Sequence, residues 1–197
     1  MSILIKITPQ DVNLREALRY AGGGGDENTL ALARECQKEA ENTFSFGICY
    51  RVFDVKITDE LCDFGDFSVK SFDLAKNLSR CRRVCVFGAT LGAGFDRLLI
   101  KYSRISPAKA LLLQGIGAER IEALCDAFCE HLKGEGYRLK PRFSPGYGDL
   151  PLDTQKELFA SLSLEKMLGI TLNDSLLMSP TKSVTAFVGI LEENYGF

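Results

Sequence analysis

The segment with the clearest chemical potential is Arg142-Phe-Ser-Pro-Gly-Tyr147, which continues into Gly148 and Asp149. It places a guanidinium, a phenol, a carboxylate and several turn-forming residues close together in the sequence. A guanidinium can hold a carboxylate or phosphate through two parallel hydrogen bonds, and a tyrosine offers an aromatic face beside it. We expect exposed backbone amides around Gly146 and Gly148 to complete such a site. The segment is therefore interpreted as a ligand-binding loop or, alternatively, as a proline–glycine surface turn.

A row of acidic residues precedes this loop on a long predicted helix. Pro107 begins a helical stretch that runs to about Lys133 and is softened at Gly115 and Gly117. Apolar residues in its second half have the spacing of a packed helix face: Ile121, Leu124, Cys125, Phe128 and Leu132. The opposite face carries Glu119, Glu122, Asp126 and Glu130. We interpret this row as a solvated face or, alternatively, as the source of an acid that faces a cleft over the Arg142 loop.

Two other patterns carry weaker chemical signals. Residues 84–87 predict a buried strand, and glycines at 88, 92 and 94 lead into a helix from about Phe95 to Ser103. Strand, glycine loop and helix can form a phosphate site, but the Lys-Ser/Thr ending of a P-loop is missing, so we favour a tight connection. The seven cysteines lack the spacing of zinc sites, and we interpret them as small buried residues, with a metal site as the lesser alternative.

The composition excludes several classes of protein. The chain has 197 residues, 46% of them hydrophobic, a formal net charge of −2 and a pI near 5.6. We expect residues 1–197 to form a single domain that does not bind nucleic acid, because no basic surface is indicated. The sequence contains no run of 18 apolar residues and no apolar segment near residue 1 of the kind found in signal peptides, so we expect neither a membrane span nor a secretion signal. We therefore expect no membrane association and a cytoplasmic location.

The periodicity of apolar residues predicts an α+β fold. Strands are expected at 2–7, 45–57, 64–69, 84–87, 170–173 and 183–190. Helices are expected at 8–20, 28–40, 71–78, 95–103, 107–133, 155–162 and 163–168, with Ser71 and Asp153 as caps. Strands and helices do not alternate strictly. This order favours a mixed, mainly antiparallel twisted sheet with long helices packed on it.

The Arg142–Tyr147 loop resembles the Arg-x-x-x-Gly-Tyr signature of the activation domain of cobalamin-dependent methionine synthase. Further segments resemble that family in the same order: Asp153-Thr-Gln-Lys, Gly169-Ile-Thr-Leu-Asn173 with Ser175, Met178-Ser-Pro180, and Ser183-Val184. Ala118 to Leu132 is similar to the family's long helix before the loop. Residues 85–197 form the matched core, whereas residues 1–80 match weakly. The resemblance implies the fold of that activation domain.

In that family the module binds S-adenosylmethionine and presents its methyl group to a corrinoid that has been oxidised to cob(II)alamin. The resemblance implies a stand-alone accessory subunit that reactivates a separate methionine synthase lacking its own activation domain. Cobalamin would come only with that partner, and a flavodoxin-like protein is the expected electron donor. We see no nucleophile or general base beside the loop that would indicate catalysis by this chain alone. The alternatives are reactivation of another corrinoid methyltransferase, or a non-catalytic ligand-sensing or scaffold protein.

The resemblance also assigns ligand-binding roles to individual residues. Arg142 is expected to bind the ligand's carboxylate, and Asp126, which aligns with a ligand-binding Glu of the family, its ammonium or ribose. Tyr147 is expected to contribute its hydroxyl and its aromatic face near the sulfonium. The remaining expected positions are Ser144, Gly146 and Tyr195.

Two departures from the family's pattern concern the same ligand. The family's N-terminal ligand-binding Asp aligns with Gly22. The His-Pro element that precedes the family's C-terminal aromatic pair is missing before Tyr195. About half of the family's ligand-binding positions therefore have matching residues in this sequence.

Overall fold

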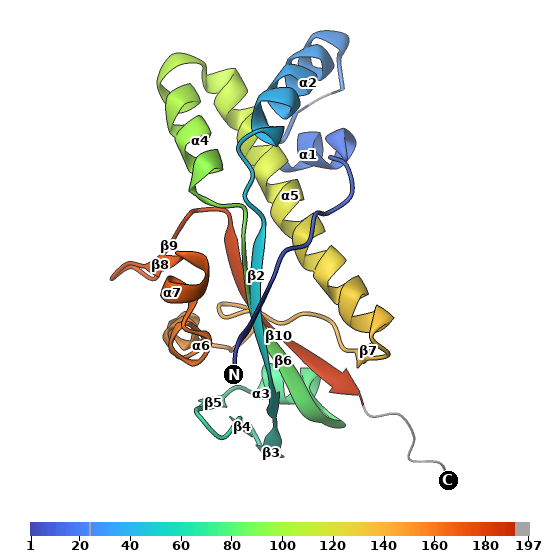
Figure 1. The fold of residues 1–197 in the computed structure, drawn as a ribbon, viewed down its shortest axis with the longest axis vertical. Helices are drawn as coiled ribbons and strands as arrows, with labels where there is room; N and C mark the ends of the chain where they lie inside the picture. Colours follow the sequence, from blue (N-terminus) through green and yellow to red (C-terminus); the bar gives the residue numbers. More distant parts are fainter. Residues whose placement is uncertain (24, 192–197) are drawn as a thin grey trace.

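The computed structural model describes residues 1–23 and 25–191, and its centre is a five-stranded antiparallel sheet (Figure 1). The strand order is β1-β2-β6-β10-β7. The strands are β1 (Ile3–Ile5), β2 (Gly47–Asp54), β6 (Cys81–Thr90), β10 (Ser183–Leu191) and β7 (Arg138–Leu139). The predicted α+β class with a mainly antiparallel sheet is confirmed, and every strand pair among the described residues is antiparallel.

Helices and two small sheets surround the central sheet (Figure 1). The helices are α1 (Leu14–Tyr20), α2 (Glu27–Glu41), α3 (Phe72–Asn77), α4 (Ala93–Ile105), α5 (Pro107–Gly134), α6 (Gln155–Leu162) and α7 (Leu164–Leu168), with a 3-10 turn η1 (Leu152–Thr154). One small sheet contains β3 (Lys56–Thr58), β4 (Leu61–Asp63) and β5 (Ser68–Lys70), and the other β8 (Thr171–Leu172) and β9 (Met178–Ser179).

Each face of the sheet covers its own hydrophobic core, because successive side chains of a strand point to opposite faces. On one face, residues such as Phe87 and Val188 pack with α1, α2, α4 and α5. On the other face, Val86 and Phe187 pack with leucines of α3, α6 and α7. The predicted helix at 155–162 has the same bounds as α6, and Ser71 caps α3 as expected by accepting a hydrogen bond from the amide of Leu74 at 3.0 Å.

Helix α5 is continuous through the two glycines at which softening was expected. These glycines allow close packing instead. A β-carbon on Gly115 would overlap the carbonyl oxygen of Ala17 in α1, and one on Gly117 would overlap the ring of Phe95 in α4. The helix thereby approaches both neighbours along its first half and directs its second half across the sheet (Figure 1).

A buried ion pair on α5 determines where the first helix begins. Arg120 donates to Glu119 at 2.5 and 2.6 Å and also to the carbonyl oxygens of Gln10 and Asp11. Glu119 in turn accepts the amide of Asn13 at 3.1 Å. The chain is therefore held extended up to Asn13, and the prediction of a helix from residue 8 is wrong: α1 begins at Leu14.

The prediction of one long strand over 45–57 and a second over 64–69 is also wrong. The first divides into β2 and β3, and the hairpin partner of β3 is β4. The chain turns at Asp59, whose φ is positive, and again at Gly65. Residues 64–67 therefore connect β4 to β5 instead of forming a strand. The two tight turns are the reason why the structure differs from the prediction.

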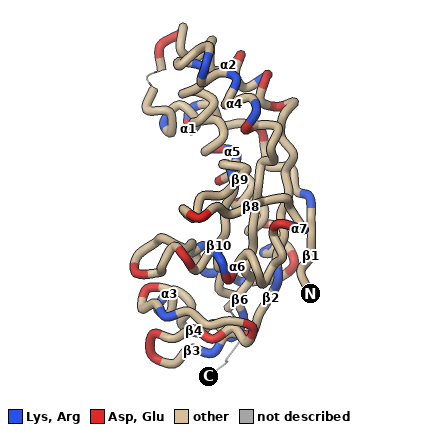
Figure 2. Tube along the Cα trace, turned by 90° about the vertical axis from the view of Figure 1, so that its left-hand side faces the viewer, with Lys and Arg blue, Asp and Glu red and all other residues tan. Residues whose placement is uncertain are grey.

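Charged residues of both signs are distributed along the trace (Figure 2). Each of the α-helices among the described residues contains residues of both signs, in agreement with the formal net charge of −2. Among the described residues, no helix is both long and apolar enough to cross a lipid bilayer.

The role of Gly115 predicts a difference between two glycines of the same helix. Gly115→Ala should lower the free energy of unfolding by about 1–3 kcal/mol, because the added methyl group meets backbone atoms of α1 that cannot move away cheaply. Gly134→Ala, at the open end of α5, should be neutral or stabilising by up to about 1 kcal/mol. Urea denaturation of both variants measures the two effects. Equal stabilities would contradict the close-packing role of Gly115.

Candidate functional site

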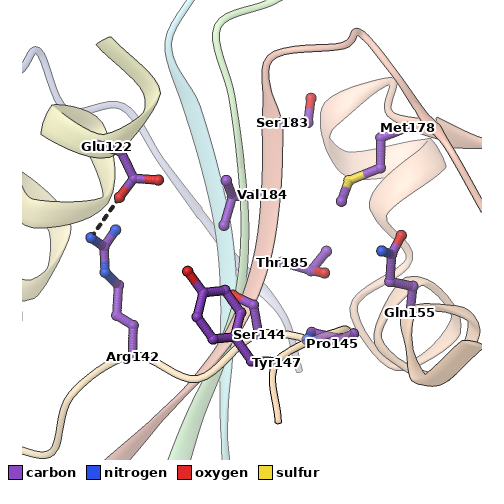
Figure 3. A pocket seen from close by; sticks show the side chains of 10 residues that line it. All are labelled: Glu122, Arg142, Ser144, Pro145, Tyr147, Gln155, Met178, Ser183, Val184 and Thr185. Carbon is purple, nitrogen blue, oxygen red and sulfur yellow. Dashed lines mark hydrogen bonds and ion pairs between the residues drawn. The ribbon is translucent and has the colours of Figure 1, made fainter. Parts of the chain in front are cut away.

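A pocket of about 330 Å³ lies at the outer edge of β10 and contains the Arg142 loop (Figure 3). This volume is within the range of small-molecule sites. Helix α5 bounds it on one side, α6 and β9 on the other, and the start of β10 forms its back wall. Its lining consists of Glu122, Arg142, Ser144, Pro145, Tyr147, Gln155, Met178, Ser183, Val184 and Thr185.

The pocket exists because the loop first follows β10 and then leaves it. Phe143 pairs with Phe187 through two backbone hydrogen bonds of 2.9 and 2.8 Å. The loop then turns, with the amide of Tyr147 donating to the carbonyl of Ser144 at 3.1 Å. The amide of Gly146 donates to the carbonyl of Leu150 at 2.9 Å, so it is engaged within the loop and the expectation that it is free for a ligand is wrong.

One end of the pocket is charged. Arg142 donates from the same nitrogen, Nη2, to Glu122 Oε2 and to Asp126 Oδ1, both at 2.9 Å. The Arg142 side chain is partly buried, with 24% of it exposed, whereas the side chain of Asp126 is 71% exposed. The three side chains together carry one negative charge: two carboxylates against one guanidinium. This end can therefore bind a group of either sign, and it favours a ligand with an excess of positive charge.

The electrostatic environment keeps Arg142 charged. Burial acts to lower the pKa of its guanidinium, but the nearby Cys125 sulfur and the carboxylates of Glu122 and Asp126 act in the other direction and raise it overall. Since an arginine loses its proton only at very high pH in any case, the Arg142 cation is a permanent feature of the pocket.

The opposite end of the pocket is polar but uncharged. Gln155 and Met178 form its wall, and Thr185 lies at the back (Figure 3). Gln155 is 5% exposed and Thr185 2% exposed. Ser183, beside them, is already engaged, because its hydroxyl donates to the carbonyl oxygen of Pro180 at 2.8 Å and lies 2.9 Å from the Thr90 hydroxyl, from which it can accept a second hydrogen bond. The pocket thus has a charged end on α5 and a neutral end on α6.

Asp149 belongs to the motif that suggested the site, but it is not among the residues that line the pocket. Its carboxylate accepts hydrogen bonds from the Ser71 hydroxyl, from the amide of Phe72 at 2.8 Å and from the amide of Asp73 at 3.1 Å. It therefore caps α3 and ties the end of the loop to that helix. Gly148 has a positive φ, and a β-carbon there would overlap the Asp73 carboxylate, so glycine allows this close approach.

The structure brings only part of the predicted binding set into the pocket. Arg142, Ser144 and Tyr147 line it. Gly146 shapes the turn, and Asp126 contacts Arg142 from outside the lining. Tyr195 lies outside the described residues.

Seven lining residues were not among the expected ligand-binding positions: Glu122, Pro145, Gln155, Met178, Ser183, Val184 and Thr185. Glu122 belongs to the acidic row, of which Glu119 proves to be buried against Arg120 and Glu130 to pair with Lys133. The other six lie in or beside the segments that carry the family resemblance. The sequence signal that pointed to these residues was therefore the order of the segments that resemble the family.

The cysteines and the glycine loop lie apart from this chemistry. Among the described residues, no three metal-binding side chains gather in one place. Six of the seven cysteines are buried, and burial raises the pKa of Cys49 and Cys62 to about 11. At the glycine loop, β-carbons on Gly92 and Gly94 would overlap residues 43–45, so that segment packs tightly against its neighbour.

Comparison with known proteins gives a match in structure and none in sequence. No family model matches the chain, and no curated protein matches it. A solved structure, the crystal structure of the MetH reactivation domain bound to AdoHcy, matches 100% of this chain and 80% of that one, with a TM-score of 0.70 and 13% sequence identity. The fold expected from the loop motifs is therefore confirmed, and the structural match extends over residues 1–80, where the sequence motifs were weak.

The capping role of Asp149 predicts a pH-dependent contribution to stability. Its pKa is lowered, first by the hydrogen bond from Ser71, with burial opposing and the amides of Phe72 and Asp73 adding to the effect. A carboxylate with a lower pKa in the folded state stabilises the protein above its unfolded pKa and loses this effect as the pH falls through the folded value. Asp149→Asn should therefore be less stable than the wild type at neutral pH, and the gap should close below about pH 4.

Thermal unfolding of both proteins between neutral and acidic pH measures this gap. Asp153→Asn, at an exposed position in the following turn, is the matched control and should show no comparable gap. A gap for Asp149→Asn that stays constant down to the lowest pH would contradict the role of its charge.

Proposed function

We propose that the protein binds S-adenosylmethionine in the pocket beside β10 and presents its methyl group to a corrinoid held by a separate methionine synthase. The observation that carries this proposal is the division of the pocket into a charged end and a neutral polar end. S-adenosylmethionine has the same division, with a charged amino acid and sulfonium at one end and a neutral nucleoside at the other. The reactivation domain with the same fold was solved with AdoHcy, the form of this ligand without the methyl group.

The charged end suits the amino-acid part of the ligand. Both carboxylates meet the guanidinium at Nη2, so a ligand carboxylate can approach the fork of Arg142 and displace one of them. The displaced carboxylate, Glu122 or Asp126, is then available for the ligand's ammonium. Arg142 then binds the ligand's carboxylate and the displaced acid binds the ligand's ammonium. No charged group of the cluster therefore lacks a partner of opposite charge.

Tyr147 lies at the rim of the pocket and is 69% exposed, with its ring 6.4 Å from that of Phe143. An aromatic face attracts a cation such as the sulfonium, and at the rim it would direct the methyl group outward. The partner's corrinoid would supply the reduced cobalt that accepts the methyl group. The chain itself contributes binding and orientation, which lower the barrier without a nucleophile of its own.

We place this activity in the cytoplasm. All seven cysteines are free in the structure, and scattered free cysteines are typical of a reducing compartment.

Binding of S-adenosylmethionine and its dependence on Arg142 can be measured by calorimetric titration. The wild type should bind, and Arg142→Ala should lose about 2–5 kcal/mol of binding free energy, because a buried charge pair loses one partner. Arg138→Ala, at an exposed position of β7, is the control and should bind like the wild type. Absence of binding by the wild type would contradict the proposed function, and unchanged binding by Arg142→Ala would place the site elsewhere.

Reactivation can be tested by reconstitution with a methionine synthase that lacks an activation domain. With a flavodoxin or a chemical reductant, the wild type should support transfer of a labelled methyl group from S-adenosylmethionine to the partner's corrinoid, and Arg142→Ala should not. Transfer only with a different corrinoid methyltransferase would change the partner. Ligand binding without transfer to either would indicate a ligand-sensing protein.

A further inference from the structure

We infer that Gln155 and Thr185, with Met178, form the subsite for the adenine base and that Gln155 recognises its exocyclic amino group. This inference rests on the proposed function, since it assigns an orientation to the ligand in the same pocket. It concerns the neutral end, the part of the pocket farthest from the Arg142 cluster (Figure 3).

The first argument is that two buried polar atoms at this end have no partner. The Gln155 Oε1 and Thr185 Oγ1 atoms are inaccessible to solvent and make no hydrogen bond with the described residues. An unpaired buried polar group costs about 1–3 kcal/mol, and native proteins contain few of them. In Figure 3 the Thr185 hydroxyl points toward the side of the pocket where Gln155 lies. Both residues line the same pocket, so we assign these two atoms to a ligand that enters it.

The backbone of β10 adds a donor and an acceptor at the same place. Alternate residues of a strand direct their N–H and C=O groups to the same side, so those of Thr185 point to the side on which Phe187 pairs with Phe143. The loop has already turned away there. None of the hydrogen bonds made by residues 144–150, all of which are described, reaches Thr185. The neutral end thus offers an amide, a hydroxyl and a strand edge.

The absence of charge at this end decides which part of the ligand it holds. Among the residues that the structure describes, the charged ones that line the pocket are Glu122 and Arg142, both at the opposite end (Figure 3). Burying an ammonium, a carboxylate or a sulfonium beside Gln155 would carry an unfavourable desolvation free energy. This free energy is far larger than the free energy gained from hydrogen bonds to one amide and one hydroxyl. A neutral base has no such cost, and the Met178 thioether and the Pro145 ring provide apolar contacts for its faces.

The amide of Gln155 is suited to adenine in particular. A glutamine amide can accept from the N6 amino group of adenine and donate to N7 at the same time. Hypoxanthine carries a carbonyl oxygen in place of the amino group, so it would leave the Gln155 oxygen facing another acceptor. A site built to hydrogen-bond an amino group rejects the analogue that lacks it.

The test compares S-adenosylhomocysteine with S-inosylhomocysteine, which differ at the substituent on C6 of the base and in the proton on the adjacent N1. By calorimetry, the wild type should bind the adenine ligand roughly 10- to 100-fold more tightly, the range that one paired amide provides. Gln155→Leu should bind both ligands weakly and with similar affinity. Gln114→Leu, at an exposed position of α5 outside this pocket, should keep the wild-type preference.

A second measurement separates a binding role from a structural one. If Oε1 of Gln155 serves the ligand, its removal should leave the unfolding midpoint of the ligand-free protein unchanged or raise it, because an unpaired buried atom is lost. A clearly lower midpoint for Gln155→Leu would assign Gln155 to the structure and overturn the inference.

The outcomes distinguish this inference from the proposed function. Equal affinity of the wild type for both ligands, or a preference that persists in Gln155→Leu, would overturn the base subsite while the proposed function stands. Failure of the wild type to bind either ligand would overturn both.

Discussion

The candidate site depends on the attachment of two adjacent residues, Arg142 and Phe143, to opposite sides of the same sheet. Arg142 reaches the acids of α5, on the face covered by the long helix. Phe143 pairs with Phe187 and packs into the core on the other face. Since neighbouring residues of an extended chain point in opposite directions, one strand-like step satisfies both attachments. Phe143 extends the sheet next to β10 by one residue pair, and the chain then leaves the sheet. The pocket lies beside β10 where this pairing ends.

Helix α3 holds the rest of the loop in place through contacts at both of its ends. Its last residue, Asn77, donates to the carbonyl of Pro141 at 3.3 Å, and its first turn is capped by Asp149. The loop is therefore fixed at both ends by one short helix, and Leu150 is buried directly after it. Only the turn around Gly146 and Tyr147 extends to the rim. A loop with rigid ends and an exposed tip is the arrangement in which binding residues are commonly presented.

Local sequence signals predicted the elements whose ends are set locally. The bounds of α6 and the cap at Ser71 follow from residues within one helical turn. The start of α1 does not, because it is set by Glu119 and Arg120, more than 100 positions away. The site divides in the same way. Arg142 was recognisable from its type and its neighbours, whereas Gln155 and Thr185 become significant only when the fold places their unpaired atoms beside one pocket.

The same distinction applies to the carboxylates of Asp149 and Glu122. Both are carboxylates close to Arg142 in the sequence or on a neighbouring helix face, and residue type alone cannot separate them. The separation comes from competition between partners: the first turn of α3 offers two amides and a hydroxyl to Asp149, while the arginine is the partner available to Glu122. Because the Asp149 carboxylate is held by the donors at the start of α3, the charge balance at Arg142 is set by Glu122 and Asp126. Their combined excess of one negative charge matches the net positive charge of S-adenosylmethionine, whose ammonium and sulfonium outweigh its carboxylate. The helix cap and the binding cluster therefore belong to one electrostatic arrangement, in which each carboxylate near the loop has a separate partner.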